Sequence, residues 1–93
     1  MKPAPAILRP ILARRARYRR DALRQQHQIV FPEGVLVLNE TGAAIVQLCD
    51  GRRVNDLIVR VNEQFADGNH AAEVIAFLDR LSGKGLLDDA RDS

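Results

Sequence analysis

A turn containing proline and glycine, set between two β-forming segments, most strongly restricts what this chain can fold into. In the Phe-Pro-Glu-Gly sequence at 31–34, proline takes the second position and glycine the fourth, as in a type I turn. β-branched and aromatic residues precede the turn at 27–31, and an aliphatic run follows it at 35–38. Such a short, continuous run is typical of a strand buried on both faces, and we expect this of 35–38.

A further strand is predicted upstream of this turn. Residues 16–21 alternate weakly, with Tyr18 between arginines, and the polar stretch 21–25 separates them from 27–31. Two such segments joined by a polar loop favour a hairpin. Together with 35–38, the sequence predicts three strands.

Three helices are expected after the strands. Asn39 fits an N-cap, with Glu40 in the first turn where the helix dipole favours an anion. Helix breaks are expected at 50–51, 67–69 and 82–85, because glycine occurs in each of them. The apolar residues with helical spacing are Ala44, Ile45, Leu48 and Cys49, then Val54, Leu57, Ile58, Val61 and Phe65, then Val74, Phe77, Leu78 and Leu81.

The order of elements predicts an α+β fold, a small winged-helix-like domain with a three-stranded antiparallel sheet followed by three helices. Three strands cannot close a barrel, so the sheet keeps two edges and rests one face on the helices. The proline-rich residues 1–15 are expected to form a flexible basic arm, 16–88 the folded domain and 89–93 a frayed tail.

The charge is distributed unevenly along the chain. Residues 1–34 carry eight basic and two acidic side chains, whereas 35–93 carry six and ten. A winged helix that binds nucleic acid through the arginines at 14–24 is therefore one hypothesis. Against it, the second and third predicted helices mix both signs of charge, so neither is a basic recognition helix. A solvated strand edge that discourages aggregation explains the arginines equally well.

Little in the sequence supports catalysis. Cys49 falls on an apolar helical stripe and is expected to be a buried core residue. His27 and His70 are expected at the surface, without the companions of a metal site. We therefore expect no enzyme activity, metal or cofactor. The single cysteine fits a reducing compartment, and the apolar runs are far below the roughly 18 residues that span a bilayer, so we expect a cytoplasmic protein without a membrane helix.

The central block of the chain resembles the PqqD family of pyrroloquinoline quinone biosynthesis. The resemblance rests on the Pro-Glu-Gly turn, the aliphatic strand, the cap at Asn39, the stop at 50–51 and the ending at 77–87. It implies a non-catalytic peptide chaperone, a recognition element for ribosomally made and modified peptides. Its implied partners are a PqqA-like precursor peptide and a PqqE-like radical S-adenosylmethionine (SAM) enzyme that receives the peptide. One departure is Arg52-Arg53 after the helix stop, where the family often has threonine and valine.

The same resemblance implies where the peptide lies. An extended peptide can add a strand at a free sheet edge and place alternate side chains in apolar pockets. In the family it lies between the third strand and the third helix, and the alternative for each residue there is a purely structural role in the core. The implied peptide-binding residues are Val35, Leu36, Val37, Leu38, Val74, Phe77, Leu78 and Leu81. A homodimer formed through the strand edge or a swapped arm is a further hypothesis.

Overall fold

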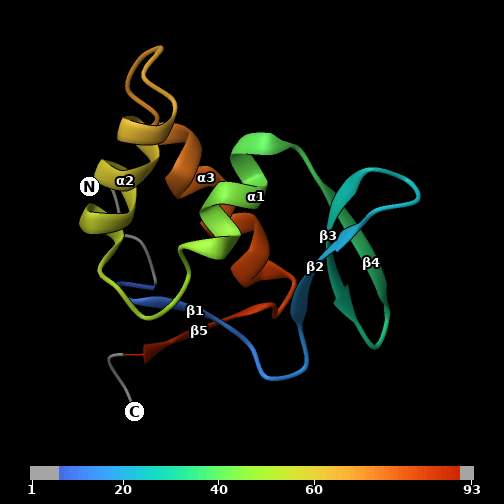
Figure 1. Ribbon diagram of the computed structural model, residues 1–93. Coiled ribbons are helices and arrows are strands. Elements are labelled where there is room, and N and C mark those ends of the chain that lie inside the picture. Colours follow the sequence, from blue (N-terminus) through green and yellow to red (C-terminus); the bar gives the residue numbers. More distant parts are fainter. Residues whose placement is uncertain (1–6, 91–93) are drawn as a thin grey trace.

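Two antiparallel sheets flank three helices in the computed structural model, which describes residues 7–90 (Figure 1). The larger sheet has the strand order β2-β3-β4, and the smaller pairs β1 with β5. Among the described residues, no helix is long and apolar enough to span a membrane. The elements are β1 (Pro10–Leu12), β2 (Arg17–Asp21), β3 (Gln26–Phe31), β4 (Gly34–Leu38), α1 (Glu40–Gln47), α2 (Val54–Gln64), α3 (Ala71–Gly83) and β5 (Leu87–Asp89).

The predicted three-stranded sheet and three helices are confirmed. The turn at 32–33 joins β3 to β4, and Phe31 pairs with Gly34 across it. Gly34 has a φ of +156°, which is favourable only for glycine. At the start of α1, Asn39 Oδ1 accepts a hydrogen bond of 2.7 Å from the Gly42 amide, so the predicted N-cap is present.

The prediction that 35–38 is buried on both faces is wrong. Leu38 is buried, but Val35 and Val37 are 53% and 55% exposed. Successive side chains of a strand point to opposite faces, and the helices cover only one face of this sheet (Figure 1). Strand β4 lies at the edge of the sheet. Its second face is therefore apolar and open.

Residues 10–12 were expected to lie in a flexible arm. This is wrong, because they form β1. Pro10 pairs with Asp89 and Leu12 with Leu87, so the expected tail also enters a strand at β5. The Pro10 carbonyl further accepts a 2.9 Å hydrogen bond from the Gly51 amide. Proline is tolerated as the first residue of a strand, and no local feature of residues 10–12 indicates a strand partner so distant along the chain. Residues 1–6 and 91–93 of these two segments lie outside the described residues.

The core lies where the helices pack against the inner face of the larger sheet. Its completely buried side chains come from β3, all three helices and the segment before β5, as expected for a single small core. They include Ile29, Ile45, Leu57, Val61, Val74, Leu81 and Leu86.

Candidate peptide-binding site

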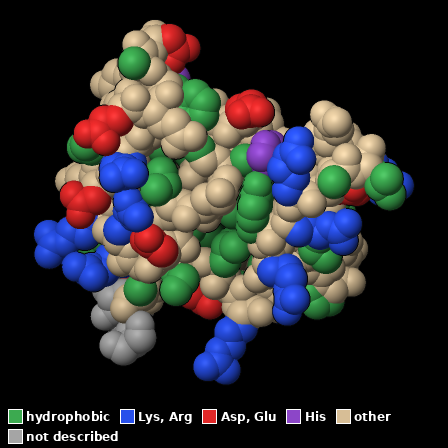
Figure 2. Space-filling view, in the orientation of Figure 1, with side chains coloured by type: hydrophobic (Ala, Val, Ile, Leu, Met, Phe, Trp, Pro, Cys, Tyr) green, Lys and Arg blue, Asp and Glu red, His purple; other side chains and the backbone are tan. Residues whose placement is uncertain are grey.

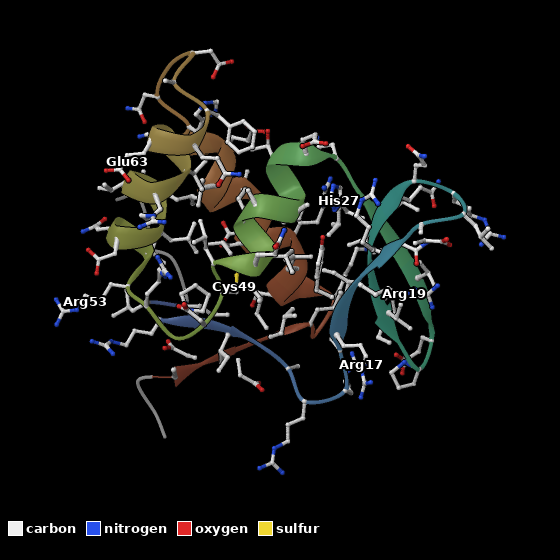
Figure 3. The ribbon with its side chains drawn as sticks, in the orientation of Figure 1. Arg17, Arg19, His27, Cys49, Arg53 and Glu63 are labelled. Carbon is white, nitrogen blue, oxygen red and sulfur yellow. The ribbon has the colours of Figure 1, made fainter. Side chains whose placement is uncertain are left out.

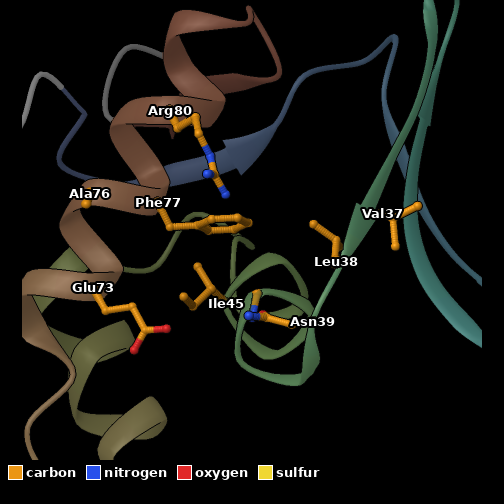
Figure 4. A pocket seen from close by; sticks show the side chains of 9 residues that line it. Val37, Leu38, Asn39, Ile45, Glu73, Ala76, Phe77 and Arg80 are labelled. Carbon is orange, nitrogen blue, oxygen red and sulfur yellow. The ribbon is translucent and has the colours of Figure 1, made fainter.

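An open groove of about 550 Å³ lies between β4, the start of α1 and one face of α3 (Figure 4). In Figure 2, hydrophobic side chains line the hollow between the helical side and the sheet side of the molecule. The groove is lined by Val37, Leu38, Asn39, Gly42, Ile45, Glu73, Ala76, Phe77 and Arg80.

Helix α3 presents two different faces. Val74, Leu78 and Leu81 are at most 3% exposed and point into the core. The neighbouring stripe faces the groove at the helical spacing i, i+3, i+4 and i+7, which places side chains in one row. That stripe consists of Glu73, Ala76, Phe77 and Arg80. The helix therefore holds the fold together with one stripe and walls the groove with the next.

Three of the implied peptide-binding residues line the groove: Val37, Leu38 and Phe77. Leu36 is partly buried against the core, and Val35 lies on the open face of β4. The polar and small residues of the groove were not predicted, because the most apolar helical stripe is the strongest signal in the sequence of α3. The groove residues that were missed lie one position before or two positions after a core residue of α3. This neighbouring row was the signal that could have identified them.

Strand β4 offers backbone groups along its outer edge. A β-turn bonds the carbonyl of its first residue to the amide of its fourth, so Phe31 and Gly34 form a hydrogen-bonded pair. Hydrogen-bonded and non-hydrogen-bonded pairs alternate along antiparallel strands. Val35 and Val37 therefore direct their N–H and C=O groups away from β3. No other described strand pairs with this edge.

The floor of the groove depends on the close approach of α1 to α3. A Cβ atom added at Gly42 would lie 3.3 Å from Phe77 Cζ and 3.0 Å from Asn39 Oδ1. Glycine thus leaves room for both the aromatic ring and the capping side chain. Beside them, Ile45 is almost fully buried and forms an apolar base.

One basic and one acidic side chain face the groove from α3. The Arg80 guanidinium carbon lies 5.4 Å from the centre of the Phe77 ring, in cation–π contact. Glu73 Oε1 lies 3.2 Å from His70 Nδ1 and belongs to a cluster at the start of the helix.

His70 is held by acceptors on both of its ring nitrogens. Its Nε2 lies 2.9 Å from the Phe65 carbonyl oxygen and 2.8 Å from Asp67 Oδ1. These contacts raise the pKa of His70, with the carboxylate of Glu73 as the largest cause and that of Asp67 next. The expectation of a surface histidine is wrong, because the side chain is only 14% exposed.

His27 is likewise half-buried rather than at the surface. Its Nδ1 lies 2.7 Å from the hydroxyl of Tyr18, and the two rings stack. This pair packs between β2 and β3, on strands that the sequence analysis had assigned to the sheet.

Cys49 lies inside the domain below α1 (Figure 3), as predicted. Burial raises the pKa of its thiol to about 12, and the Sγ atom donates a hydrogen bond to the Ile45 carbonyl. The thiol is therefore a packed core group. Within residues 7–90, no group of three or more histidine, cysteine, aspartate or glutamate side chains is placed to hold a metal ion.

Several Lys and Arg side chains gather on the sheet side of the molecule, and others lie on the helical side (Figure 2). Arg17 and Arg19 project on the sheet side from β2 (Figure 3). Asp21 accepts hydrogen bonds from the Leu23 and Arg24 amides, and the contacts with Arg24 lower its pKa. The arginines at 14–24 thus lie on β2 and in the turns on either side of it, and not on a helix that a nucleic-acid groove would admit.

The fold and groove define a winged-helix-like α+β domain whose free strand edge borders a helix-walled groove. The same fold occurs in the solution NMR structure of the PqqD truncation of Methylobacterium extorquens PqqCD, described as a functional and stand-alone RiPP recognition element. The TM-score is 0.74, with 24% identity over 91% of this chain and 93% of that one. Residues 26–87 match the family described as coenzyme PQQ synthesis protein D (PqqD), and the chain belongs to this family.

Curated relatives support the same assignment. The chain is 39% identical to the PqqA binding protein of Rhodopseudomonas palustris strain TIE-1, over 91% of this chain and 86% of the relative. It is 47% identical to the PqqA binding protein of Klebsiella pneumoniae, over 62% of this chain and 65% of the relative. The similarity to the first relative includes most of the segment before residue 26.

Proposed function

We propose that this protein binds a PqqA-like precursor peptide as an added strand on β4, with the peptide lying against α3. It acts as a peptide chaperone and not as an enzyme, and presents the bound peptide to a PqqE-like radical SAM enzyme in the cytoplasm. The relatives named as PqqA binding proteins support the choice of peptide. The single observation that carries the proposal is the groove beside the outer edge of β4, where no other described strand pairs with the backbone of Val35 and Val37.

The physical basis is strand addition. Main-chain hydrogen bonds to the edge supply affinity that is independent of sequence, while alternate side chains of the peptide enter the groove and supply specificity. The remaining side chains would lie over the exposed faces of Val35 and Val37, which are more than half exposed in the free protein. An added strand would therefore contact apolar side chains on both of its faces.

A titration with the precursor peptide tests this proposal. We expect the amide resonances of isotopically labelled Val35, Val37, Phe77 and Arg80 to shift together, while those of α2 stay in place. Shifts confined to β2, or no shifts, would contradict the proposed site. Repeating the titration with the radical SAM enzyme present tests the presentation step, for which a ternary complex is expected.

Dimerisation through the same edge is a competing use of β4. Because a second copy and a peptide would pair with the same backbone groups, we expect added peptide to displace any such dimer. Light scattering with and without the peptide measures this directly.

A further inference from the structure

Opposite charges stand at the two ends of the α3 wall of the groove. Glu73 and Arg80 lie about two helical turns apart, which is roughly 10 Å along the axis. Figure 4 shows both side chains directed to the groove, with Glu73 at the end nearest Asn39 and Arg80 beyond the ring of Phe77. Between the two charges the wall is apolar, formed by Ala76 and Phe77.

Both charges remain available to a ligand. Glu73 contacts His70 through Oε1, and no hydrogen bond or ion pair from a described residue reaches Oε2. Its side chain is 52% exposed. Arg80 lies against the Phe77 ring and forms no ion pair with a described carboxylate. Contacts with His70 and Phe77 restrict where each charged group lies, which reduces the entropy lost when a ligand pairs with it.

The geometry of an added strand matches this spacing. Residues of a strand rise about 3.3 Å each and alternate between faces, so positions i, i+2 and i+4 face α3 and span roughly 13 Å. The two outer positions then lie near Glu73 and Arg80, within the reach of long side chains. The central position lies over Phe77 and Ile45, where an apolar side chain fits.

The direction of the strand fixes the order of charges. In Figure 1, β4 runs from the turn up to α1, and α3 runs the opposite way. A peptide antiparallel to β4 therefore starts beside Glu73 and ends beside Arg80. Antiparallel pairs are also the commoner kind.

We propose that the groove selects a segment of the form basic–x–apolar–x–acidic, bound antiparallel to β4 with its basic side chain on Glu73 and its acidic side chain on Arg80. This inference rests on the proposed strand addition and specifies the peptide that the site prefers. Arg80 and Glu73 act as specificity residues, while the backbone of β4 contributes the binding that all peptides share.

The test compares two capped synthetic peptides of identical composition. One carries Lys-Thr-Val-Thr-Glu at its centre and the other carries Glu-Thr-Val-Thr-Lys. Exposed ion pairs are individually weak, so with two attractive contacts replaced by two repulsive ones we expect about a tenfold preference for the first peptide at low salt. The preference should decrease as ionic strength rises.

Charge-exchange variants give the decisive comparison. The double variant Glu73→Lys with Arg80→Glu keeps the net charge and should reverse the preference. The matched control is Asp79→Lys with Lys84→Glu, which exchanges charges at exposed positions outside the groove lining and should leave the preference unchanged. In the Arg80→Gln variant, the affinity should no longer depend on the acidic residue of the peptide, while its dependence on the basic residue should remain. Circular dichroism confirms that each variant is folded.

Three results would overturn the proposed preference for a basic–x–apolar–x–acidic segment, which we call the charge code. These are equal affinity of the native protein for both peptides, an unchanged preference in the double exchange, or no binding of either peptide. The precursor peptide, titrated in parallel, separates the two levels of the proposal. If it shifts Val35 and Val37 while the designed peptides fail, strand addition stands and the charge code falls, whereas an unshifted β4 edge refutes strand addition itself.

Discussion

Gly42 of α1 lies so close to Phe77 of α3 that a methyl group on its Cα would come within 3.3 Å of the ring. Because Asn39 Oδ1 would lie only 3.0 Å from the same methyl group, both the N-cap and the position of the Phe77 ring in the groove wall depend on this glycine. The contact joins the end of β4, the start of α1 and the α3 wall of the groove.

The variant Gly42→Ala tests this contact. Alanine would normally stabilise a helix interior by about 1 kcal/mol over glycine, but here the ring or the cap must shift. We expect a lower free energy of unfolding and weaker peptide binding, measured by urea denaturation and calorimetry. The matched control is Gly83→Ala at the end of α3, where an added Cβ meets nothing within 4 Å, and this variant should be neutral or stabilising. Equal effects at both positions would show that the Gly42 contact is unimportant.

Val37→Pro removes one outward N–H from the edge of β4. Since that group does not pair with β3, the sheet should persist, and circular dichroism should match the native protein. Loss of one backbone hydrogen bond predicts a decrease in peptide affinity of up to about tenfold. Val37→Thr keeps both the N–H and the β-branch and serves as the control. Native affinity in the proline variant would place the peptide elsewhere.

His70 makes the stability of the domain depend on pH. Its pKa is raised in the folded state, so its stabilising contribution is complete below the unfolded value of about 6.5 and is lost as the pH rises through the folded value. We therefore expect His70→Gln to destabilise the domain more at pH 5.5 than at pH 8.5, measured by urea denaturation at both values. A difference between native and variant that grows with pH would contradict this assignment.

Cys49 should be nearly inert in the folded protein. With burial raising its pKa from 9.0 to about 12, the thiolate fraction at pH 8 is roughly a thousandfold below that of a free thiol. Reaction with a colorimetric disulfide reagent should be very slow in buffer and fast in guanidinium chloride. Rapid labelling of the native protein would indicate that this part of the core opens readily.

The arginines of β2 should contribute little to peptide binding. Arg17 and Arg20 are exposed on the first strand of the sheet, which is separated from β4 by β3. Replacing both with glutamine should change the affinity for the precursor peptide by less than about twofold at 0.15 M salt, because exposed charges at this distance are screened. Binding of a DNA duplex that falls steeply with salt and is lost in this variant would support the nucleic-acid hypothesis instead.

Local sequence signals were sufficient to predict the parts of the fold that are built locally. The turn before Gly34, the cap at Asn39 and the helical spacing of the core residues each depend on near neighbours, and the structure contains all of them. The β1–β5 pairing was missed because it joins Pro10 to Asp89, and a three-residue strand carries almost no periodic signal.

The site was predicted less completely than the fold. The location between the third predicted strand and the third helix agrees with the groove, but Val74, Leu78 and Leu81 turned out to be core residues. Hydrophobicity identifies the stripe that is most buried, whereas the groove wall from Glu73 to Arg80 combines charge with apolar surface. Which stripe of α3 faces outward depends on how the helix packs against the rest of the domain. The sequence of the helix alone does not show this.

The pairing of β1 with β5 also has a consequence for joining this domain to others. Pro10 and Asp89 are paired neighbours. A linker on the amino-terminal side of Pro10 and a linker on the carboxyl-terminal side of Asp89 would therefore leave the domain at the same place. In Figure 1 that place lies below the helices and away from the outer edge of β4. A fused enzyme or reporter could thus be tethered on either side of the sequence without covering the groove, and a circular permutant that connects these two strands should retain it.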